Sequence, residues 1–182
     1  MLKVCFFCKK WKKINLVKIF CFFWILIYYI YMTSNKFMEL AQKMAQKAYD
    51  YDEVPIGAVI VSSDGKIISK AYNKREKTQN ALLHAEIIAI NNACKKLKSW
   101  RLDGCSIYVT LMPCPMCAGA ILNARIKTLY FGALATNDTQ NLCEKILSDS
   151  TRLNHKTQIV YLPNENCQNI LKKYFQQKRN SS

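Results

Sequence analysis

His84-Ala85-Glu86 and Pro113-Cys114-Pro115-Met116-Cys117 are the two stretches on which the fold and the chemistry of this 182-residue chain depend. Together they offer one imidazole and two thiolates, which fill three corners of a tetrahedral metal site. The fourth corner stays open for water, and an open corner is typical of a catalytic rather than a structural zinc. Glu86 follows the histidine by two residues, near enough to relay protons without binding the metal. The two stretches therefore predict one catalytic Zn²⁺ per chain, held by His84, Cys114 and Cys117, with Glu86 as the acid and base.

Each stretch alone has a simpler explanation. A single histidine is more often a core or surface group than a ligand, and a single Cys-x-x-Cys pair can be redox-active or structural. The combination favours the metal site, because Glu86 accompanies the histidine and both stretches open segments that look helical.

The spacing of these residues places the predicted ligands at the starts of two helices. Cys114 and Cys117 lie three residues apart and so project from one face of a first helical turn, where the helix dipole favours thiolate. His84 and Glu86 precede the series Ile87, Ile90, Cys94 and Leu97, which has the spacing of one buried helix face. We therefore expect two helix N-termini to converge on one metal.

Length and cysteine usage indicate a single intracellular domain. Residues 36–182 are enough for one full core, and nothing in them repeats. The nine cysteines are scattered and odd in number, and two of them are needed as thiolates. A reducing compartment, the cytoplasm, fits this usage best, with Cys94, Cys105, Cys143 and Cys167 as small buried or incidental side chains.

Residues 1–35 do not belong to that domain. They carry basic residues, no acidic one, and an uninterrupted apolar run over residues 19–32. That run is shorter than the roughly 20 residues needed to cross a bilayer, and it lacks the cleavage site of a secretory signal. A misplaced start, with translation beginning at Met32 or Met38, is the interpretation we favour. A membrane anchor and an organelle address are the alternatives, and only these would give the protein membrane contact or an organellar location.

The charge of the chain points to a polyanionic partner. The formal net charge is +15, and the residues from Met38 onward still carry +8. Lysines and arginines set against phosphates release counterions, so this excess suits a nucleic acid, although a solvated basic surface is the simpler alternative. The C-terminal segment alternates basic and aromatic groups, as stacking and phosphate contact require, and we expect RNA contacts there from Lys172, Lys173, Tyr174, Phe175, Lys178 and Arg179.

A pass along the chain predicts an α/β fold. An amphipathic helix around Phe37 to Ala48 precedes strands at residues 54–61 and 67–72, which a Ser63-Asp64-Gly65 turn joins. The His84 helix follows, then a strand at 106–111, the Cys114 helix, a strand at 128–133, a helix through the 140s, a strand near 158–162 and a terminal helix. We expect three α/β/α layers, with a central mixed sheet of about five strands and helices on both faces.

At the level of motifs, the chain resembles the bacterial tRNA-specific adenosine deaminases, which belong to the cytidine and deoxycytidylate deaminase superfamily. The H-x-E and P-C-x-x-C motifs are the signature of zinc-dependent nucleobase deaminases. The resemblance runs in order over about residues 37–179. Its motifs are Val54-Pro55-Ile56-Gly57-Ala58-Val59, Tyr72-Asn73-Lys74, His84-Ala85-Glu86, Tyr108-Val109-Thr110, Pro113 to Ile121, Ala124-Arg125-Ile126, Phe131-Gly132-Ala133 and Leu153-Asn154-His155.

The resemblance implies a cytidine-deaminase-like fold and a homodimer with active sites near the subunit interface. It also implies hydrolytic deamination of an adenosine to inosine. The adenosine is the one at the wobble position of the anticodon of an arginine tRNA. His84, Cys114 and Cys117 would hold zinc and Glu86 would shuttle protons. Asn73 matches the pocket asparagine that reads the base edge, and the backbone N–H of Ala85 is a further expected substrate contact.

Two departures from the family pattern affect these expectations. Met112 stands where the family usually has glutamate, so we expect different hydrogen bonding beside an intact zinc site. Leu134-Ala135 replaces a polar or basic residue and an aspartate. Two other functions stay open: a zinc deaminase of a free guanine- or cytosine-type base, nucleoside or nucleotide, and a non-enzymatic RNA-binding module. The basic C-terminal segment disfavours the former, and Glu86 beside an open zinc position disfavours the latter.

Overall fold

The computed structural model describes residues 15–135, 137–148 and 155–181 of the chain. The chain divides into two compact units, residues 1–35 and residues 36–182. The first helix, α1 (Asn15–Asp50), contributes to both units. No helix in the described part of the chain is long and apolar enough to cross a membrane.

The second unit contains five strands and five further helices among its described residues. In chain order they are β1 (Gly57–Val61), β2 (Ile67–Tyr72), α2 (Arg75–Thr78), α3 (Ala85–Leu97), β3 (Ser106–Leu111), α4 (Pro115–Asn123), β4 (Thr128–Ala133), α5 (Asn137–Ser148), β5 (Gln158–Tyr161) and α6 (Glu165–Asn180).

The five strands form one mixed sheet with the order β2-β1-β3-β4-β5. β1 pairs with β2 and with β3 in antiparallel orientation, whereas β3, β4 and β5 run parallel to one another. The parallel connections from β3 to β4 and from β4 to β5 contain α4 and α5, as parallel strands require. The sheet therefore has the mixed character and the strand number that the sequence predicts.

Successive side chains of a strand point to opposite faces of the sheet. The core is therefore divided into two apolar clusters, one on each face. In β1, Ala58 and Ile60 belong to one cluster and Val59 and Val61 to the other. The first cluster contains buried alanines of α3 together with buried apolar side chains of α4 and α5. The second contains Phe37, Met38 and Ala41 of α1 and Cys167 and Leu171 of α6.

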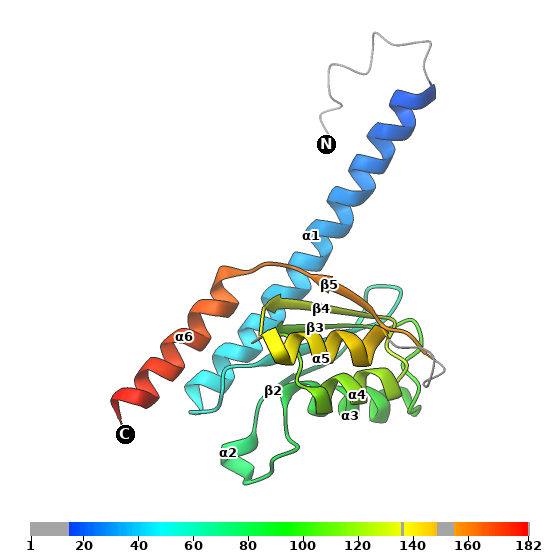
Figure 1. The fold of residues 1–182 in the computed structure, drawn as a ribbon. Helices are drawn as coiled ribbons and strands as arrows, with labels where there is room; N and C mark the ends of the chain where they lie inside the picture. The colour runs from blue at the N-terminus through cyan, green and yellow to red at the C-terminus, as the bar shows by residue number, and fades with distance from the viewer. Residues whose placement is uncertain (1–14, 136, 149–154, 182) are drawn as a thin grey trace. The chain divides into compact units, whose positions relative to one another are not determined.

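Helices consequently cover both faces of the sheet (Figure 1), with α3, α4 and α5 on one face and α6 and the later part of α1 on the other. This confirms the predicted three-layer α/β/α architecture. On the second face, α1 lies very close to β1. A methyl group at Gly57 would overlap the backbone of Ala41 and Ala45 in α1.

Several sequence-based boundaries need correction. The first strand begins at Gly57 rather than Val54, since Pro55 has no N–H to give to a ladder. The first helix begins at Asn15, as no glycine or proline between residues 15 and 50 stops it. The short helix α2 was not predicted. The strands at 67–72, 106–111 and 128–133 have the predicted bounds.

The buried face of α3 also differs from the prediction. Its fully buried residues are Ala85, Glu86, Ala89 and Ala93, whereas Leu97 of the predicted face is 42% exposed. Three alanines allow this helix to lie close to β1 and β2, while Ile90 and Cys94 of the predicted face are half-buried and pack against the same core cluster. Among the other cysteines, Cys105, Cys143 and Cys167 are buried and Cys94 is half-buried, all as free thiols.

Candidate metal and catalytic site

The predicted ligands lie at two helix starts. His84 is the N-cap residue of α3, with an extended backbone at φ −70° and ψ 153°. Cys114 is the N-cap residue of α4, at φ −74° and ψ 167°, and Pro115 occupies the first turn, where its missing N–H costs nothing. Cys117 follows in the first turn of the same helix. The two helix N-termini thus face one another at the end of β3, as expected.

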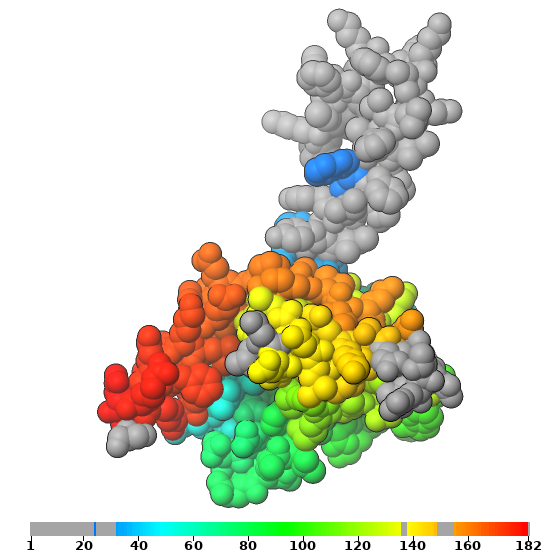
Figure 2. Space-filling model, in the orientation of Figure 1, coloured from blue at the N-terminus to red at the C-terminus, as the bar shows by residue number. Residues whose placement is uncertain are grey.

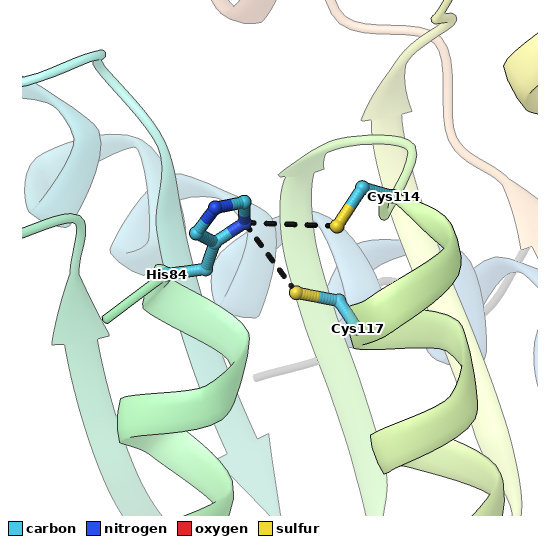
Figure 3. Close-up of side chains that lie close together, drawn as sticks. All are labelled: His84, Cys114 and Cys117. Atoms are coloured by element: carbon cyan, nitrogen blue, oxygen red, sulfur yellow. Dashed lines mark hydrogen bonds between the residues drawn. The ribbon is translucent and has the colours of Figure 1, made fainter. Parts of the chain in front are cut away.

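The three ligand atoms are spaced as a zinc site requires. The His84 Nδ1 atom lies 3.7 Å from the Cys114 Sγ atom and 3.6 Å from the Cys117 Sγ atom. Tetrahedral zinc with bonds of about 2.3 Å to sulfur and about 2.0–2.1 Å to nitrogen separates such ligand atoms by about 3.6 Å. Figure 3 shows the three side chains pointing toward one another from α3 and α4. In the described part of the chain, this is the group of histidine, cysteine or acidic side chains able to hold a metal ion.

Glu86 lies inside the same site but outside the ligand set. Its side chain is 2% exposed, and its Oε2 atom has no hydrogen-bond partner. Burial raises the pKa of this carboxyl group. A buried acid with an unused oxygen is costly in a structural role, because no hydrogen bond offsets the desolvation of that oxygen. Its position instead suits exchange of protons with a substrate or a water.

The two thiols differ in acidity in the absence of metal. The thiol of Cys117 and the nearby His84 lower the pKa of Cys114 to about 4. The hydrogen bond that Cys117 makes to Cys114, and then its burial, raise the pKa of Cys117. One sulfur is therefore ready to bind a metal as thiolate, and the other must give up its proton when the metal binds.

Asn73 and Ala85 are connected to this site through the backbone. Asn73 is 2% exposed, and its Oδ1 atom has no partner. The next residue, Lys74, donates its backbone N–H to the carbonyl oxygen of Leu83 at 3.0 Å, so the end of β2 is tied to the residue before His84. Ala85 is the first residue of α3, and its N–H has no acceptor within the helix. Both residues thus retain unused polar groups for a ligand.

One supporting contact was not predicted. The thiol of Cys143 in α5 donates to the carbonyl oxygen of Pro113 at 2.9 Å. Met112 donates its backbone N–H to the carbonyl oxygen of Ala133, while its side chain is buried in the apolar core. No local sequence pattern predicts this hydrogen bond, because 30 residues separate Cys143 from Pro113.

The two departures from the family pattern have different surroundings. Met112 places a buried apolar side chain directly before the ligand turn. Leu134 is 45% exposed and Ala135 is half-buried, at the end of β4. Residues Leu153 and Asn154 of the last motif lie outside the described residues, and His155 contacts the carbonyl oxygen of Ile126 at 2.9 Å.

The C-terminal helix corrects one predicted RNA contact. Tyr174 is only 6% exposed, and its hydroxyl group donates to the carbonyl oxygen of Asp52, so its ring is unavailable for base stacking. It belongs to the helix face that begins at Cys167 and Leu171. Lys178 forms an ion pair with Asp52 at 2.7 Å. Lys178 and the other predicted contacts, Lys172, Lys173, Phe175 and Arg179, are all exposed.

Comparison with known proteins places this chain and its fold among the deaminases. The sequence profile of the family described as MafB19-like deaminase matches residues 32–179. A solved structure from a study of A-to-I editing by tRNA:A34 deaminases at the wobble position superposes with a TM-score of 0.68 and 37% identity. The superposition covers 75% of this chain and 99% of that one.

Two proteins of Bacillus subtilis are also similar to this chain. The tRNA-specific adenosine deaminase of Bacillus subtilis is 42% identical over 153 residues, which are 81% of this chain and 92% of the relative. Guanine deaminase of the same species is 30% identical in a structural match with a TM-score of 0.54, covering 80% of this chain and 93% of that one. The chain belongs to the MafB19-like deaminase family and, within it, to the tRNA-specific adenosine deaminases.

Proposed function

We propose that this protein is a tRNA adenosine deaminase that converts the wobble adenosine of an anticodon to inosine, in an arginine tRNA. In this reaction water adds at C6 of adenine, the bond from C6 to the exocyclic nitrogen breaks, and ammonia leaves. The observation that carries the proposal is the buried Glu86, whose Oε2 atom has no partner, beside the three convergent ligands His84, Cys114 and Cys117.

One zinc ion per subunit is the cofactor that suits this donor set, since two thiolates and an imidazole are common zinc ligands and their spacing fits a tetrahedron. When bound, zinc acts as a Lewis acid that activates water at neutral pH.

The residues of the chain supply the proton transfers and hold the base. Glu86 accepts a proton from the attacking water, delivers it to the ring nitrogen next to C6, and later assists the departure of ammonia. Its burial favours this exchange, because a raised pKa brings the carboxyl group closer to neutral pH. The Asn73 amide accepts a hydrogen bond from the edge of the adenine base, and the Ala85 N–H donates a hydrogen bond to the substrate.

The RNA binds to the basic surface of α6. Under this proposal Lys172, Lys173, Phe175 and Arg179 of α6 contact the anticodon stem-loop, with the lysines and arginine on phosphates. Replacing Lys172 and Arg179 by glutamine should weaken binding and reduce its salt slope by about 0.7–0.9 for each phosphate that the protein no longer neutralises. The enzyme acts as a homodimer, which light scattering of the purified protein would test.

The decisive experiment supplies an anticodon stem-loop with adenosine at the wobble position and measures inosine. Wild type should form inosine, whereas a stem-loop with guanosine at that position should be unchanged. Glu86→Gln should keep zinc and RNA binding and lose at least about 100-fold in rate. Normal turnover by this variant would remove Glu86 from the mechanism.

A second candidate function is deamination of free guanine, favoured by the 30% identity to a guanine deaminase. The same preparation should therefore be offered guanine, cytosine and adenosine as free compounds. Turnover of a free base at a rate above that of the stem-loop would replace the tRNA proposal with this alternative.

A further inference from the structure

Two tyrosines that are distant in sequence stack on the surface of the domain. Tyr51 follows the end of α1 and Tyr72 ends β2. Their ring centroids are 5.9 Å apart, and their planes differ by 10°. Tyr51 is 55% exposed and Tyr72 is half-buried, so neither ring is part of the apolar core. A parallel aromatic pair is thereby presented to the solvent.

A lysine accompanies each ring of this pair. The Nζ atom of Lys74 lies 5.1 Å from the ring centroid of Tyr72, and the Nζ atom of Lys77 lies 5.0 Å from that of Tyr51. The ion pairs found among the described residues involve Lys66, Arg101 and Lys178, and neither Lys74 nor Lys77 takes part in one. The positive charge beside the rings is therefore not neutralised by a bonded carboxylate.

A buried acid holds this arrangement in place. Glu53 is 1% exposed, and its carboxylate oxygens accept the backbone N–H groups of Glu76 at 3.1 Å and Lys77 at 2.8 Å. These bonds tie α2 to the turn after α1, which brings Lys77 over Tyr51. The rings and lysines are thus preorganised before any partner binds, which reduces the entropy lost on binding.

The segment that carries Lys74 and Lys77 is connected to the candidate site. Asn73, whose buried amide oxygen has no partner, stands in sequence between Tyr72 and Lys74. The backbone N–H of Lys74 donates to Leu83, the residue before His84. Figure 2 shows the end of α1, coloured cyan, beside the green surface of the α2 segment. Strand alternation turns Tyr72 to the sheet face that α1 covers and Asn73 to the face that carries the site, and β2 is the edge strand of the sheet. An RNA whose reactive base meets Asn73 can reach the tyrosine pair by passing around this edge.

We infer that Tyr51, Tyr72, Lys74 and Lys77 form a stacking surface for the unpaired nucleotides next to the target base of the RNA. Aromatic rings that stack on bases, interleaved with cations that meet phosphates, are how proteins hold single-stranded nucleic acid. The inference rests on the proposed function and adds a second RNA contact to that of α6. We call these four residues the tyrosine–lysine surface.

Kinetics with the wobble-adenosine stem-loop would test the inference. Tyr51→Leu and Lys77→Gln should each raise KM about tenfold, as expected when a stacking or phosphate interaction is removed, and should leave kcat within about twofold. Tyr51→Phe keeps the ring and should behave as wild type. Lys77→Gln should also lower the salt slope of binding by about 0.7–0.9.

Matched controls come from elsewhere in the domain. Trp100→Leu removes an aromatic side chain that is 62% exposed after α3, and Lys66→Gln removes an exposed lysine from the turn between β1 and β2. Both should leave KM unchanged. Circular dichroism and zinc content measured on every variant would show that each one is folded and loaded.

Three outcomes would overturn the inference. Unchanged KM in folded Tyr51→Leu and Lys77→Gln would leave the tyrosine–lysine surface without an RNA role. A fall in melting temperature with normal RNA affinity would make it a structural contact, and dissociation of an oligomer would make it a subunit contact. If wild type forms no inosine at all, the proposed function fails instead, and direct RNA binding by the same variants still tests the surface.

Discussion

The thiol of Cys143 donates a hydrogen bond to the carbonyl oxygen of Pro113, 2.9 Å away, and so links α5 to the residue directly before the ligand Cys114. Cys143 is fully buried. The bond satisfies a carbonyl group at the turn that begins α4, and it fixes the direction in which the chain enters the metal site. Groups that orient metal ligands in this indirect way contribute measurably to metal affinity.

Cys143→Ala should therefore lower zinc affinity by about tenfold, because the Pro113 carbonyl loses its donor and the ligand turn loses a restraint. Cys143→Ser keeps a donor and should retain most of the affinity. Competition with a chromophoric chelator would measure both. Cys105→Ala deletes another buried thiol that makes no such bond, and its zinc affinity should match that of wild type. Equal affinities for all four proteins would show that the Cys143 contact does not support the site.

The thiol of Cys143 should also resist modification. Burial raises its pKa to about 11 from an ordinary value of 9.0, so almost no thiolate is present at neutral pH. Because the folded pKa is raised, the neutral thiol favours the folded state below pH 9, and this contribution is lost as the pH rises through 11. Mass spectrometry after iodoacetamide treatment at about pH 7.5 should find Cys143 unlabelled in the native protein and labelled after denaturation.

The ligand variants should separate metal loss from loss of chemistry. Cys114→Ala, Cys117→Ala and His84→Ala each remove a ligand, and the purified proteins should contain far less than one zinc per chain and melt at lower temperature. Metal analysis by mass spectrometry checks this directly. Glu86→Gln is the matched control within the site, since it should retain full zinc. Full occupancy in either cysteine variant would refute the ligand assignment.

Two glycines offer a contrasting test of the packing. Gly57→Ala should destabilise the domain by at least about 1–3 kcal/mol, because the added methyl group overlaps the backbone of Ala41 and Ala45. Gly119→Ala should instead stabilise it by about 0.5–1 kcal/mol, because Gly119 lies within α4 and no atom lies within 4 Å of an added methyl group there. Thermal unfolding of both variants gives the comparison. Similar stability of the two would contradict the close approach of α1 to β1.

Local patterns sufficed for most of the sheet and for the metal ligands. Strands such as Thr128–Ala133 are recognised by apolar runs between turns, and the spacing of Cys114 and Cys117 is set within a single helical turn. The buried face of α3 was predicted in part: Ile90 and Cys94 pack against the core, whereas Leu97 is exposed and the smaller Ala89 and Ala93, which periodicity did not favour, are fully buried. Which face packs depends on how near the helix must lie to the sheet, and that distance is a tertiary property.

Contacts made over long sequence separations could not be predicted. Tyr174 looks like an exposed stacking residue within its own segment, but the fold places it against Asp52, 122 residues earlier. The same is true of Tyr51 and Tyr72, whose stacking depends on where α1 ends relative to β2. Sequence patterns thus identify the residues that carry chemistry more readily than the surface that surrounds them.

The packing of Phe37 limits where the functional domain can begin. Phe37 is 7% exposed, and its ring lies 5.2 Å from that of Tyr108, which in turn stacks on Tyr130. A chain starting at Met32 retains this packing and should match the full chain in inosine formation. A chain starting at Met38 lacks Phe37 and should be less stable by about 3 kcal/mol, the usual cost of deleting a buried phenylalanine side chain. Denaturant unfolding would measure the difference, and Phe37→Ala in the chain starting at Met32 should reproduce it. Equal stability of the two shortened chains would show that the domain does not depend on Phe37.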